Sequence, residues 1–243
     1  MKIVKLNAIN STNTFLRELT REAVVENFTV VITENQTNGK GQFDNKWTSE
    51  AGKNLIFSVL YRFYDLSVEK AFYLNCAISL AIYKVLSEYH KEKLKVKWPN
   101  DILSSTKKLC GILIENTVSN GRITSAIIGI GLNVNQENFP KDLLNATSLK
   151  LVTGKEIDKE ILFQELLDEI QQQLKFVDNK QFTLLQKKYE QVLYKINQPA
   201  MFWNILNGNF LGKILGVTKQ GKLIVELENE TIEIFDLKEI KFM

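Results

Sequence analysis

Apolar residues recur with two different periods in residues 1–195 of the chain. Short β-branched runs or strict alternation predict strands, whereas a spacing of three or four residues predicts helices. Helices are expected after Ser11, from Ser67 to about Tyr89, at 158–176 and at 182–192. The expected strands are residues 2–6, 28–33, 55–61, 94–98, 109–118 and 122–130, with Asn120-Gly121 as a hairpin turn between the last two.

The pattern changes near residue 196, beyond which only short strands separated by turn residues are expected. They lie at residues 200–205, 210–217, 223–227 and 231–235, with one turn at Asn207-Gly208. Their even spacing predicts a small β-barrel. In the first part, strands grouped with flanking helices indicate an α+β domain with a mixed, mostly antiparallel sheet. We therefore expect two domains, residues 1–195 and 196–243.

Composition excludes several classes of protein. The chain is 44% apolar and 24% charged, which is typical of a globular protein, and its net charge of +3 is too small to indicate a nucleic-acid or membrane surface. No apolar run approaches the roughly 18 residues of a membrane span, and residues 1–6 lack a signal-peptide pattern. Cys76 and Cys110 stand in apolar contexts, so we expect buried, reduced thiols and a cytoplasmic protein.

Two short blocks of the sequence contain the residues that most clearly suggest a ligand-binding site. The first, Gly39-Lys40-Gly41-Gln42, follows a predicted strand and precedes Trp47. Backbone N–H groups in such a loop can surround an anion, and Lys40 adds charge. The spacing is not that of a Walker loop. Taken alone, such a loop is a weak signal, and a plain surface turn is the better explanation.

The second block, Lys97-Trp98-Pro99-Asn100-Asp101, ends a predicted strand because Pro99 cannot continue the ladder. Asp101 could hold Mg²⁺ and Asn100 could orient a phosphate, with an Asx turn as the alternative. Lys108 precedes an apolar strand and could point into a cleft beside Asp101. There it would offset the charge that develops when a carboxylate attacks a phosphate. A solvated strand-end lysine is the alternative.

Two further groups of residues suggest a ligand pocket. Gly129 and Gly131 interrupt a predicted strand, and glycine there often marks a close approach of a ligand or another backbone. Asn133 follows them and could contact a nucleotide, although a β-bulge leading into a loop explains the glycines equally well. Ser11-Thr12-Asn13 supplies helix caps, and the side chains not used for capping could line the polar end of a pocket.

Together these residues resemble the biotin–protein ligase family over nearly the whole chain. The resemblance implies a class-II-synthetase-like α+β catalytic domain followed by a small SH3-like barrel. Longer members add an N-terminal DNA-binding helix-turn-helix, and this chain resembles the short form, so no direct DNA control is expected. The segments that carry the resemblance are Ser11–Asn13, Gln36, Gly39–Gly41, Trp47, Gly52–Leu55, Lys97–Asp101, Lys108–Glu115 and Gly129–Asn133.

The resemblance also implies a reaction in two steps. The carboxylate of biotin attacks the α-phosphate of ATP, with Mg²⁺ bound, to give biotinyl-5′-AMP and pyrophosphate. A lysine amine of a biotin carboxyl carrier protein, or of such a domain of a carboxylase, then takes the biotinyl group and releases AMP. The implied partners are thus biotin and the carrier, with no DNA and no membrane. The oligomeric state varies in the family, so a homodimer is one possible assembly.

Residue roles follow from the matching positions. Lys108 and Lys40 are implied to be catalytic, and Asp101 to hold the metal. Implied biotin contacts are Ser11, Thr12, Asn13, Gln36, Gly39, Lys40, Gly41, Gln42, Lys108, Gly111 and Gly129. Implied ATP contacts are Gln42, Trp47, Asn100, Asp101, Lys108 and Asn133.

The glycine-containing loop departs from the family pattern. Many family loops are rich in arginine, whereas Gln42 and Asp44 stand here where Arg or Gly is frequent. Glutamine lacks the fixed charge and forked donors of arginine. We therefore expect the adenylate to be held less tightly.

Two other functions compete with a biotin ligase. A lipoate or octanoyl transferase resembles the same catalytic fold, but the loop bearing Trp47 and the block Lys97–Asp101 argue against it. A non-catalytic protein that binds biotin or nucleotide is the second. Such a sensor needs neither an activating lysine nor a metal carboxylate, so Lys108 and Asp101 argue against it.

Overall fold

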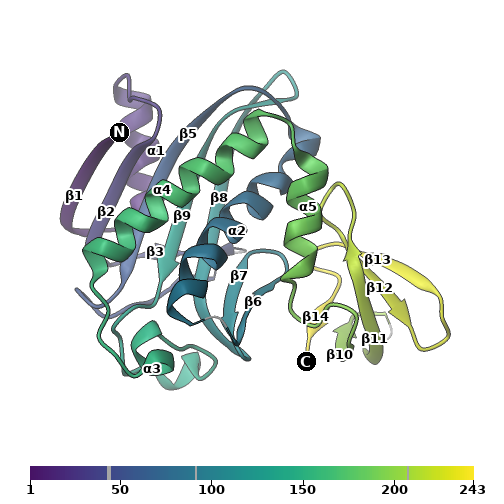
Figure 1. Cartoon of the computed structure of the whole chain (residues 1–243). Coiled ribbons are helices and arrows are strands. Elements are labelled where there is room, and N and C mark those ends of the chain that lie inside the picture. Colours follow the sequence, from purple (N-terminus) through teal and green to yellow (C-terminus); the bar gives the residue numbers. More distant parts are fainter. Residues whose placement is uncertain (43–44, 91, 207) are drawn as a thin grey trace.

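The computed structural model describes residues 1–42, 45–90, 92–206 and 208–243. A seven-stranded sheet with the order β1-β2-β5-β9-β8-β7-β6 forms its centre (Figure 1). β1 and β2 pair in parallel, and the other neighbours are antiparallel. Its strands are β1 (Lys2–Ile9), β2 (Thr29–Gln36), β5 (Leu55–Ser67), β6 (Leu94–Lys97), β7 (Asp101–Ser104), β8 (Lys107–Ser119) and β9 (Arg122–Leu132).

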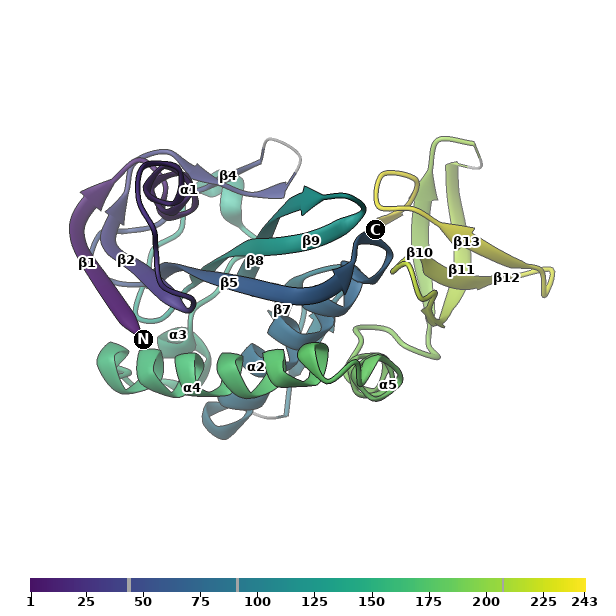
Figure 2. The same ribbon diagram turned by 90° about the horizontal axis from the view of Figure 1, so that it is seen from above.

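Helices cover the two faces of this sheet unequally, as the view in Figure 2 shows. α2 (Phe72–Tyr89), α4 (Lys159–Asp178) and α5 (Phe182–Gln191) lie on one face, and α1 (Thr12–Glu22) lies on the other. The short helices are η2 (Val68–Lys70), η3 (Lys141–Leu143) and α3 (Leu149–Thr153). Sheet and helices together confirm the predicted α+β class.

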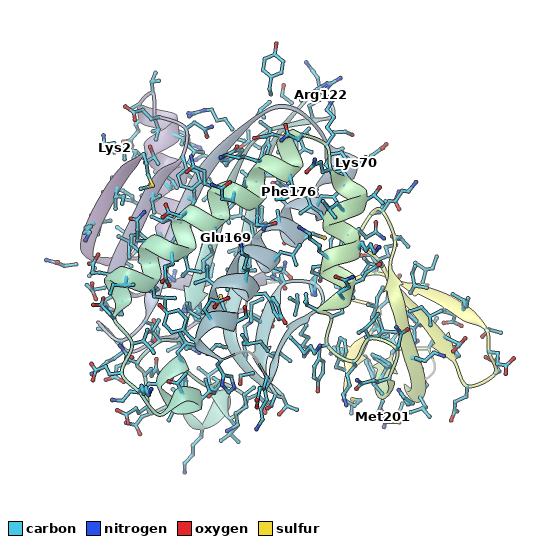
Figure 3. The ribbon with its side chains drawn as sticks, viewed as in Figure 1. Lys2, Lys70, Arg122, Glu169, Phe176 and Met201 are labelled. Carbon is cyan, nitrogen blue, oxygen red and sulfur yellow. The ribbon has the colours of Figure 1, made fainter. Side chains whose placement is uncertain are left out.

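The main core fills the space between the sheet and the helices α2 and α4. Ile78 of α2, Leu166 of α4 and Phe57 of β5 are fully buried there. At the solvent side, Glu169 of α4 accepts a hydrogen bond of 2.7 Å from Lys84 of α2; Figure 3 labels Glu169 on α4. A smaller apolar cluster under α1 includes Leu16, Val31, Leu60 and Ile127. Because α1 is held by its own cluster, its first turn has a fixed position on the sheet.

Local signals placed several element ends correctly. The Ser11 side chain caps α1 by accepting from Thr14 N. Asn120 and Gly121 have φ of 50° and 72°, the left-handed pair that a two-residue hairpin turn needs. Ser67 caps the short helix η2 rather than a continuous helix, and α2 begins only at Phe72.

The second sheet contains five strands in the order β13-β12-β11-β10-β14, all antiparallel, and lies at the right of Figure 1. Phe202, Ile214 and Val225 are fully buried in it. It fits the predicted SH3-like barrel, with β14 as an addition; the turn residue Asn207 lies outside the described residues. The strands are β10 (Pro199–Asn204), β11 (Gly208–Val217), β12 (Leu223–Leu227), β13 (Ile232–Phe235) and β14 (Lys241–Phe242).

Polar contacts at one corner join the barrel to the bend after β6 and to helix α5. Trp98 Nε1 donates to the carbonyl of Gly221 at 2.8 Å, in a buried position. Val217 N donates to Glu190 Oε1 at 3.1 Å, and Gln186 Nε2 donates to the Val217 carbonyl at 2.7 Å. The strand end that carries Trp98 and Pro99 is therefore held from the barrel side.

Among the described residues, no helix is both long and apolar enough to cross a membrane.

Candidate active site

A cavity of about 430 Å³ lies where the two sheets and the start of α1 meet. Its wall also includes a small hairpin of β3 (Gly39–Lys40) and β4 (Lys46–Trp47), which the sequence analysis treated as loop. Thirteen predicted site residues line this cavity: Ser11, Thr12, Asn13, Gln36, Lys40, Gly41, Gln42, Trp47, Asn100, Asp101, Lys108, Gly111 and Gly129. Residues up to 118 positions apart in the sequence, from Ser11 to Gly129, are thus brought to one site.

Two predicted site residues, Gly39 and Asn133, are not among the residues that line the cavity. Gly39 pairs with Trp47 in the small hairpin, and a Cβ there would lie 2.3 Å from the Trp47 carbonyl oxygen. The Asn133 side chain is buried, and its Nδ2 donates to the Thr147 carbonyl at 2.9 Å. Through these contacts both residues hold neighbouring segments in place without lining the cavity. Their direct contacts with ligands stay predictions.

Polar side chains from α1, β2 and β5 form one end of the cavity. Gln36 Oε1 accepts from Thr12 N at 2.9 Å. Asn13 Oδ1 accepts from the Ser58 hydroxyl at 2.6 Å, and Asn13 Nδ2 donates to Glu115 Oε2 at 2.7 Å. Thr12, Asn13 and Ser58 are buried, so this end is a rigid, hydrogen-bonded surface. Its polar groups are suited to a small ligand with both donors and acceptors.

The floor of the cavity is formed by the backbone of glycine residues, which carry no side chains. Gly111 of β8 faces Gly131 of β9 in the strand register. A Cβ at Gly131 would lie 2.4 Å from Trp47 Cε2, and one at Gly129 would lie 2.4 Å from Asn13 Oδ1. Glycine is therefore required so that Trp47 and Asn13 can lie directly on the sheet. The neighbours that come close at Gly129 and Gly131 are side chains, whereas a ligand or another backbone was expected, and the ligand contact stays a prediction.

Cations and one carboxylate gather on the wall nearest the barrel. Lys108 Nζ lies 2.7 Å from Asp101 Oδ1 and 5.8 Å from the centre of the Trp47 ring. Lys97 lines the same wall, and its pKa is lowered by burial and by Lys108, although Asp101 acts in the opposite direction. An arrangement of this kind can receive an anionic group and stabilise added negative charge.

The second block forms the turn of a hairpin: Lys97 ends β6, Trp98-Pro99-Asn100 make the turn, and Asp101 opens β7. Asp101 faces Lys97 of β6 and Gly111 of β8 in the register, so the turn expected at Pro99-Asn100 is present and presents Asp101 at its end. A cis peptide bond joins Trp98 and Pro99 at the preceding bend. The side chain of Asn100 is buried, and its Nδ2 donates to the Ile112 carbonyl. Asn100 therefore fixes this bend to β8 in addition to lining the cavity.

The thiols carry no chemistry at this site. Cys76 and Cys110 are both buried and unpaired, as predicted. Burial raises the pKa of the Cys110 thiol well above its ordinary value, although Lys108 nearby acts in the opposite direction. A thiolate nucleophile is thus disfavoured, even though Cys110 lies only two positions from Lys108.

A magnesium ion would find only part of its ligands in the protein. In the described ranges there is no group of three His, Cys, Asp or Glu side chains that could hold a metal. Asp101 is 25% exposed and lines the cavity. Because Mg²⁺ is usually bound by one or two carboxylates together with substrate phosphates, this single carboxylate fits.

The cavity is also lined by residues that were not predicted to belong to the site. Lys241 and Phe242, from β14, line it together with Leu237 and Ile240. Lys97 Nζ lies 5.1 Å from the centre of the Phe242 ring. The position of Lys97 within the second block could have indicated its role, whereas no local signal joins β14 to residues more than a hundred positions away. Asp44, noted as a departure in the loop, lies outside the described residues.

Comparisons with known proteins agree on one family. A sequence model described as "Biotin/lipoate A/B protein ligase family" matches residues 6–133. The bifunctional ligase/repressor BirA of Bacillus subtilis is 33% identical over 230 residues, which are 93% of this chain and 70% of that protein. Its counterpart in Bacillus spizizenii is 31% identical over 236 residues, with coverages of 96% and 72%. The structure of biotin protein ligase from Aquifex aeolicus in complex with biotin and ATP is similar over 100% of this chain and 98% of that one, with a TM-score of 0.80 and 27% identity.

Proposed function

Because the chain belongs to the biotin/lipoate A/B protein ligase family, we propose that its cavity is the active site of an ATP-dependent biotin–protein ligase. The enzyme activates biotin with ATP to biotinyl-5′-AMP and transfers the biotinyl group to a lysine of a protein. The observation that carries this function is the pair Lys108–Asp101 beside Trp47, opposite a polar end built from Thr12, Asn13 and Gln36. Relatives that match over most of the chain are biotin ligases, which disfavours the lipoate alternative.

The two ends of the cavity suit the two substrates. The ureido ring of biotin carries N–H donors and a carbonyl acceptor, which match the polar end around Thr12 and Asn13. The triphosphate of ATP matches the cationic wall with Lys97 and Lys108. The carboxylate of biotin and the α-phosphate then meet near Lys108. The main difficulty of the reaction is that two anions repel each other when they are held together. A fixed cation between them reduces this repulsion.

We assign the remaining residues by their places in the cavity. Trp47 packs against adenine or the adenylate from its position over Gly111 and Gly131. Asp101 would hold Mg²⁺, which neutralises phosphate charge and helps pyrophosphate to leave. Lys40, Gly41 and Gln42 would cover the bound intermediate from the hairpin side. Lys40 is exposed, so it can move toward a ligand without losing a buried contact.

The protein partner, the location and the domain boundary are proposals as well. The acceptor is a biotin carboxyl carrier protein or domain, since several relatives are named biotin–[acetyl-CoA-carboxylase] or biotin–protein ligases. A cytoplasmic location is supported by the two free thiols. We place the boundary between catalytic domain and barrel near residue 196, between the end of α5 and the start of β10. Direct DNA control is tested by measuring DNA binding. A homodimer is tested by measuring the mass of the protein in solution.

Biotin-dependent exchange of pyrophosphate into ATP tests the function directly. The purified chain with biotin, ATP and Mg²⁺ is expected to exchange label, and octanoate or lipoate in place of biotin is not. Addition of a carrier protein should then give one biotin per carrier by mass spectrometry. Exchange that does not require biotin, or that runs equally with octanoate, would reject the proposed function.

A further inference from the structure

A line of polar contacts runs from the surface of α1 and β8 to the polar end of the cavity. Arg17 of α1 forms an ion pair with Glu115 of β8, and both side chains are about one-third exposed, at 33% and 32%. The other carboxylate oxygen, Glu115 Oε2, accepts from Asn13 Nδ2 at 2.7 Å. Asn13 is only 3% exposed. A charged group near the surface thus contacts a buried amide that lines the cavity.

The carboxylate determines which way this amide points. An ionised carboxylate can only accept hydrogen bonds, so Asn13 must turn its NH₂ group toward Glu115. Its Oδ1 then faces Ser58, whose hydroxyl donates to it at 2.6 Å. Ser58 is fully buried, so no water can take the place of either partner.

The same constraint passes from Ser58 to Thr12. Ser58 Oγ also lies 2.7 Å from Thr12 Oγ1. The Thr12 hydroxyl also lies 3.3 Å from Gln36 Oε1. When the single Ser58 proton is used by Asn13 at 2.6 Å, the Thr12 hydroxyl donates to Ser58 and not to Gln36. Gln36 Oε1 accepts from Thr12 N at 2.9 Å, which leaves Gln36 Nε2 as the donor end of that amide. Asn13, Ser58 and Thr12 therefore share one order of donors and acceptors, and the Thr12 backbone orients Gln36 beside them.

We infer that Glu115 is a positioning residue that sets this order and thereby the fit of the biotin ureido ring. The inference rests on the proposed function, in which that ring binds at the polar end of the cavity. The ring offers two N–H donors and one carbonyl acceptor, so an inverted amide at Asn13 would present the wrong group. Glu115 itself acts through Asn13, and its ion pair with Arg17 holds the carboxylate in place.

Replacement of the acceptor tests the inference. Glu115→Leu leaves Asn13 Nδ2 with only the Leu113 carbonyl, at 3.4 Å. We expect biotin affinity, measured by isothermal titration calorimetry, to fall about tenfold, while ATP affinity stays within about threefold. Glu115→Gln can still accept from Asn13, so biotin affinity should stay within about threefold of the wild type. An unchanged biotin affinity in Glu115→Leu, or an equal fall for ATP, would overturn the inference.

The Gln variant also decides the question if Glu115→Leu does not fold. A glutamine amide can turn either way, so the order of donors and acceptors is relaxed. In 2-iminobiotin an N–H replaces the ureido carbonyl. We expect the preference for biotin over 2-iminobiotin to fall at least about threefold in Glu115→Gln. An unchanged preference would contradict the inference.

A matched ion pair elsewhere serves as the control. Asp65 pairs with Arg122 and Lys180 and is 39% exposed; Figure 3 labels Arg122 at the hairpin end of the sheet. Asp65→Leu also removes a carboxylate, but none of these three residues lines the cavity. We expect its biotin affinity to equal that of the wild type, and a tenfold loss there would overturn a specific role of Glu115. A wild-type chain that does not bind biotin would instead reject the proposed function.

Discussion

Lys108 Nζ and Asp101 Oδ1 lie 2.7 Å apart, with side-chain exposures of 38% and 25%, on one wall of the cavity. Partial exposure makes this pair a weak contribution to stability. It also keeps both groups accessible to a ligand. The pair is therefore better explained as a means of holding Lys108 in place before substrate arrives.

Lys108→Ala is expected to lower the rate of biotin-dependent pyrophosphate exchange by about 100-fold or more, because the cation next to the reacting carboxylate and phosphate is lost. Lys107→Ala is the matched control, since Lys107 is adjacent in β8 but exposed and outside the cavity. Its exchange rate should equal that of the wild type. Similar losses in both variants would show that strand β8, and not the Lys108 ammonium, is responsible.

Lys97→Met is expected to weaken ATP binding about tenfold while it raises the midpoint of thermal unfolding at pH 7. Burial is the main cause that lowers the Lys97 pKa from its ordinary value of 10.5. The unfolded chain therefore binds this proton more strongly, and the buried charge costs stability at pH values below the folded-state pKa. That cost is relieved as pH rises toward 10.5, so the stability gained by Lys97→Met should shrink over the same interval.

Thermal unfolding as a function of pH, together with ATP titration, measures both effects. Lys95→Met is the control, because Lys95 belongs to the same strand but does not line the cavity. A gain in stability for Lys95→Met that matches that of Lys97→Met would contradict the role of burial. Unchanged ATP affinity in Lys97→Met would remove Lys97 from the proposed triphosphate wall.

Gly131→Ala should displace Trp47, because the new Cβ would lie 2.4 Å from Trp47 Cε2. We expect KM for ATP to rise by about tenfold, whereas Gly131→Ala in a Trp47→Ala background should have little further effect. A double-mutant cycle on KM for ATP measures this coupling. Additive effects of the two substitutions would show that Gly131 acts independently of Trp47.

Trp98→Phe removes the hydrogen bond from Trp98 Nε1 to the Gly221 carbonyl and leaves that buried carbonyl unpaired. The free energy of unfolding should fall by about 1–3 kcal/mol, as measured by urea denaturation. Trp203→Phe, at a half-buried position of the barrel, should cost less. If Trp98→Phe were as stable as the wild type, this contact would not fasten the barrel to the first sheet.

Gln42→Arg is expected to slow release of biotinyl-5′-AMP roughly tenfold, because arginine offers a charged fork to the phosphate that glutamine lacks. Release is timed after the adenylate is trapped on the enzyme and separated from excess ATP. Gln42→Lys supplies charge without the fork and should have a smaller effect. A wild-type chain that releases the adenylate as slowly as Gln42→Arg would show that the missing arginine has no consequence.

The sequence predicted those features that depend on neighbouring residues. Ser11 as a cap and the turn at Asn120-Gly121 follow from local backbone chemistry, and the structure confirms them. The glycines at 129 and 131 indicated crowding, but not that the crowding groups are the side chains of Asn13 and Trp47. The contribution of Lys241 was not predicted, because β14 reaches the cavity only through the pairing of the barrel strands. Ser58 was missed for another reason: one serine in an apolar strand looks like an ordinary core position until α1 is placed on it.

The bare backbone at Gly111, Gly129 and Gly131 restricts how this enzyme can evolve a different ligand range. At most positions around a pocket, mutation can either remove or add volume, but here no side chain exists to be shortened. Every substitution at these three positions must fill space that Trp47, Lys108 or Asn13 now occupies. A bulkier substrate can thus be admitted only through changes in the other elements that line the cavity, such as the hairpin, α1 and β14. The glycine positions of the sheet therefore tolerate little substitution, and a change in ligand range has to come from the elements that cover the sheet.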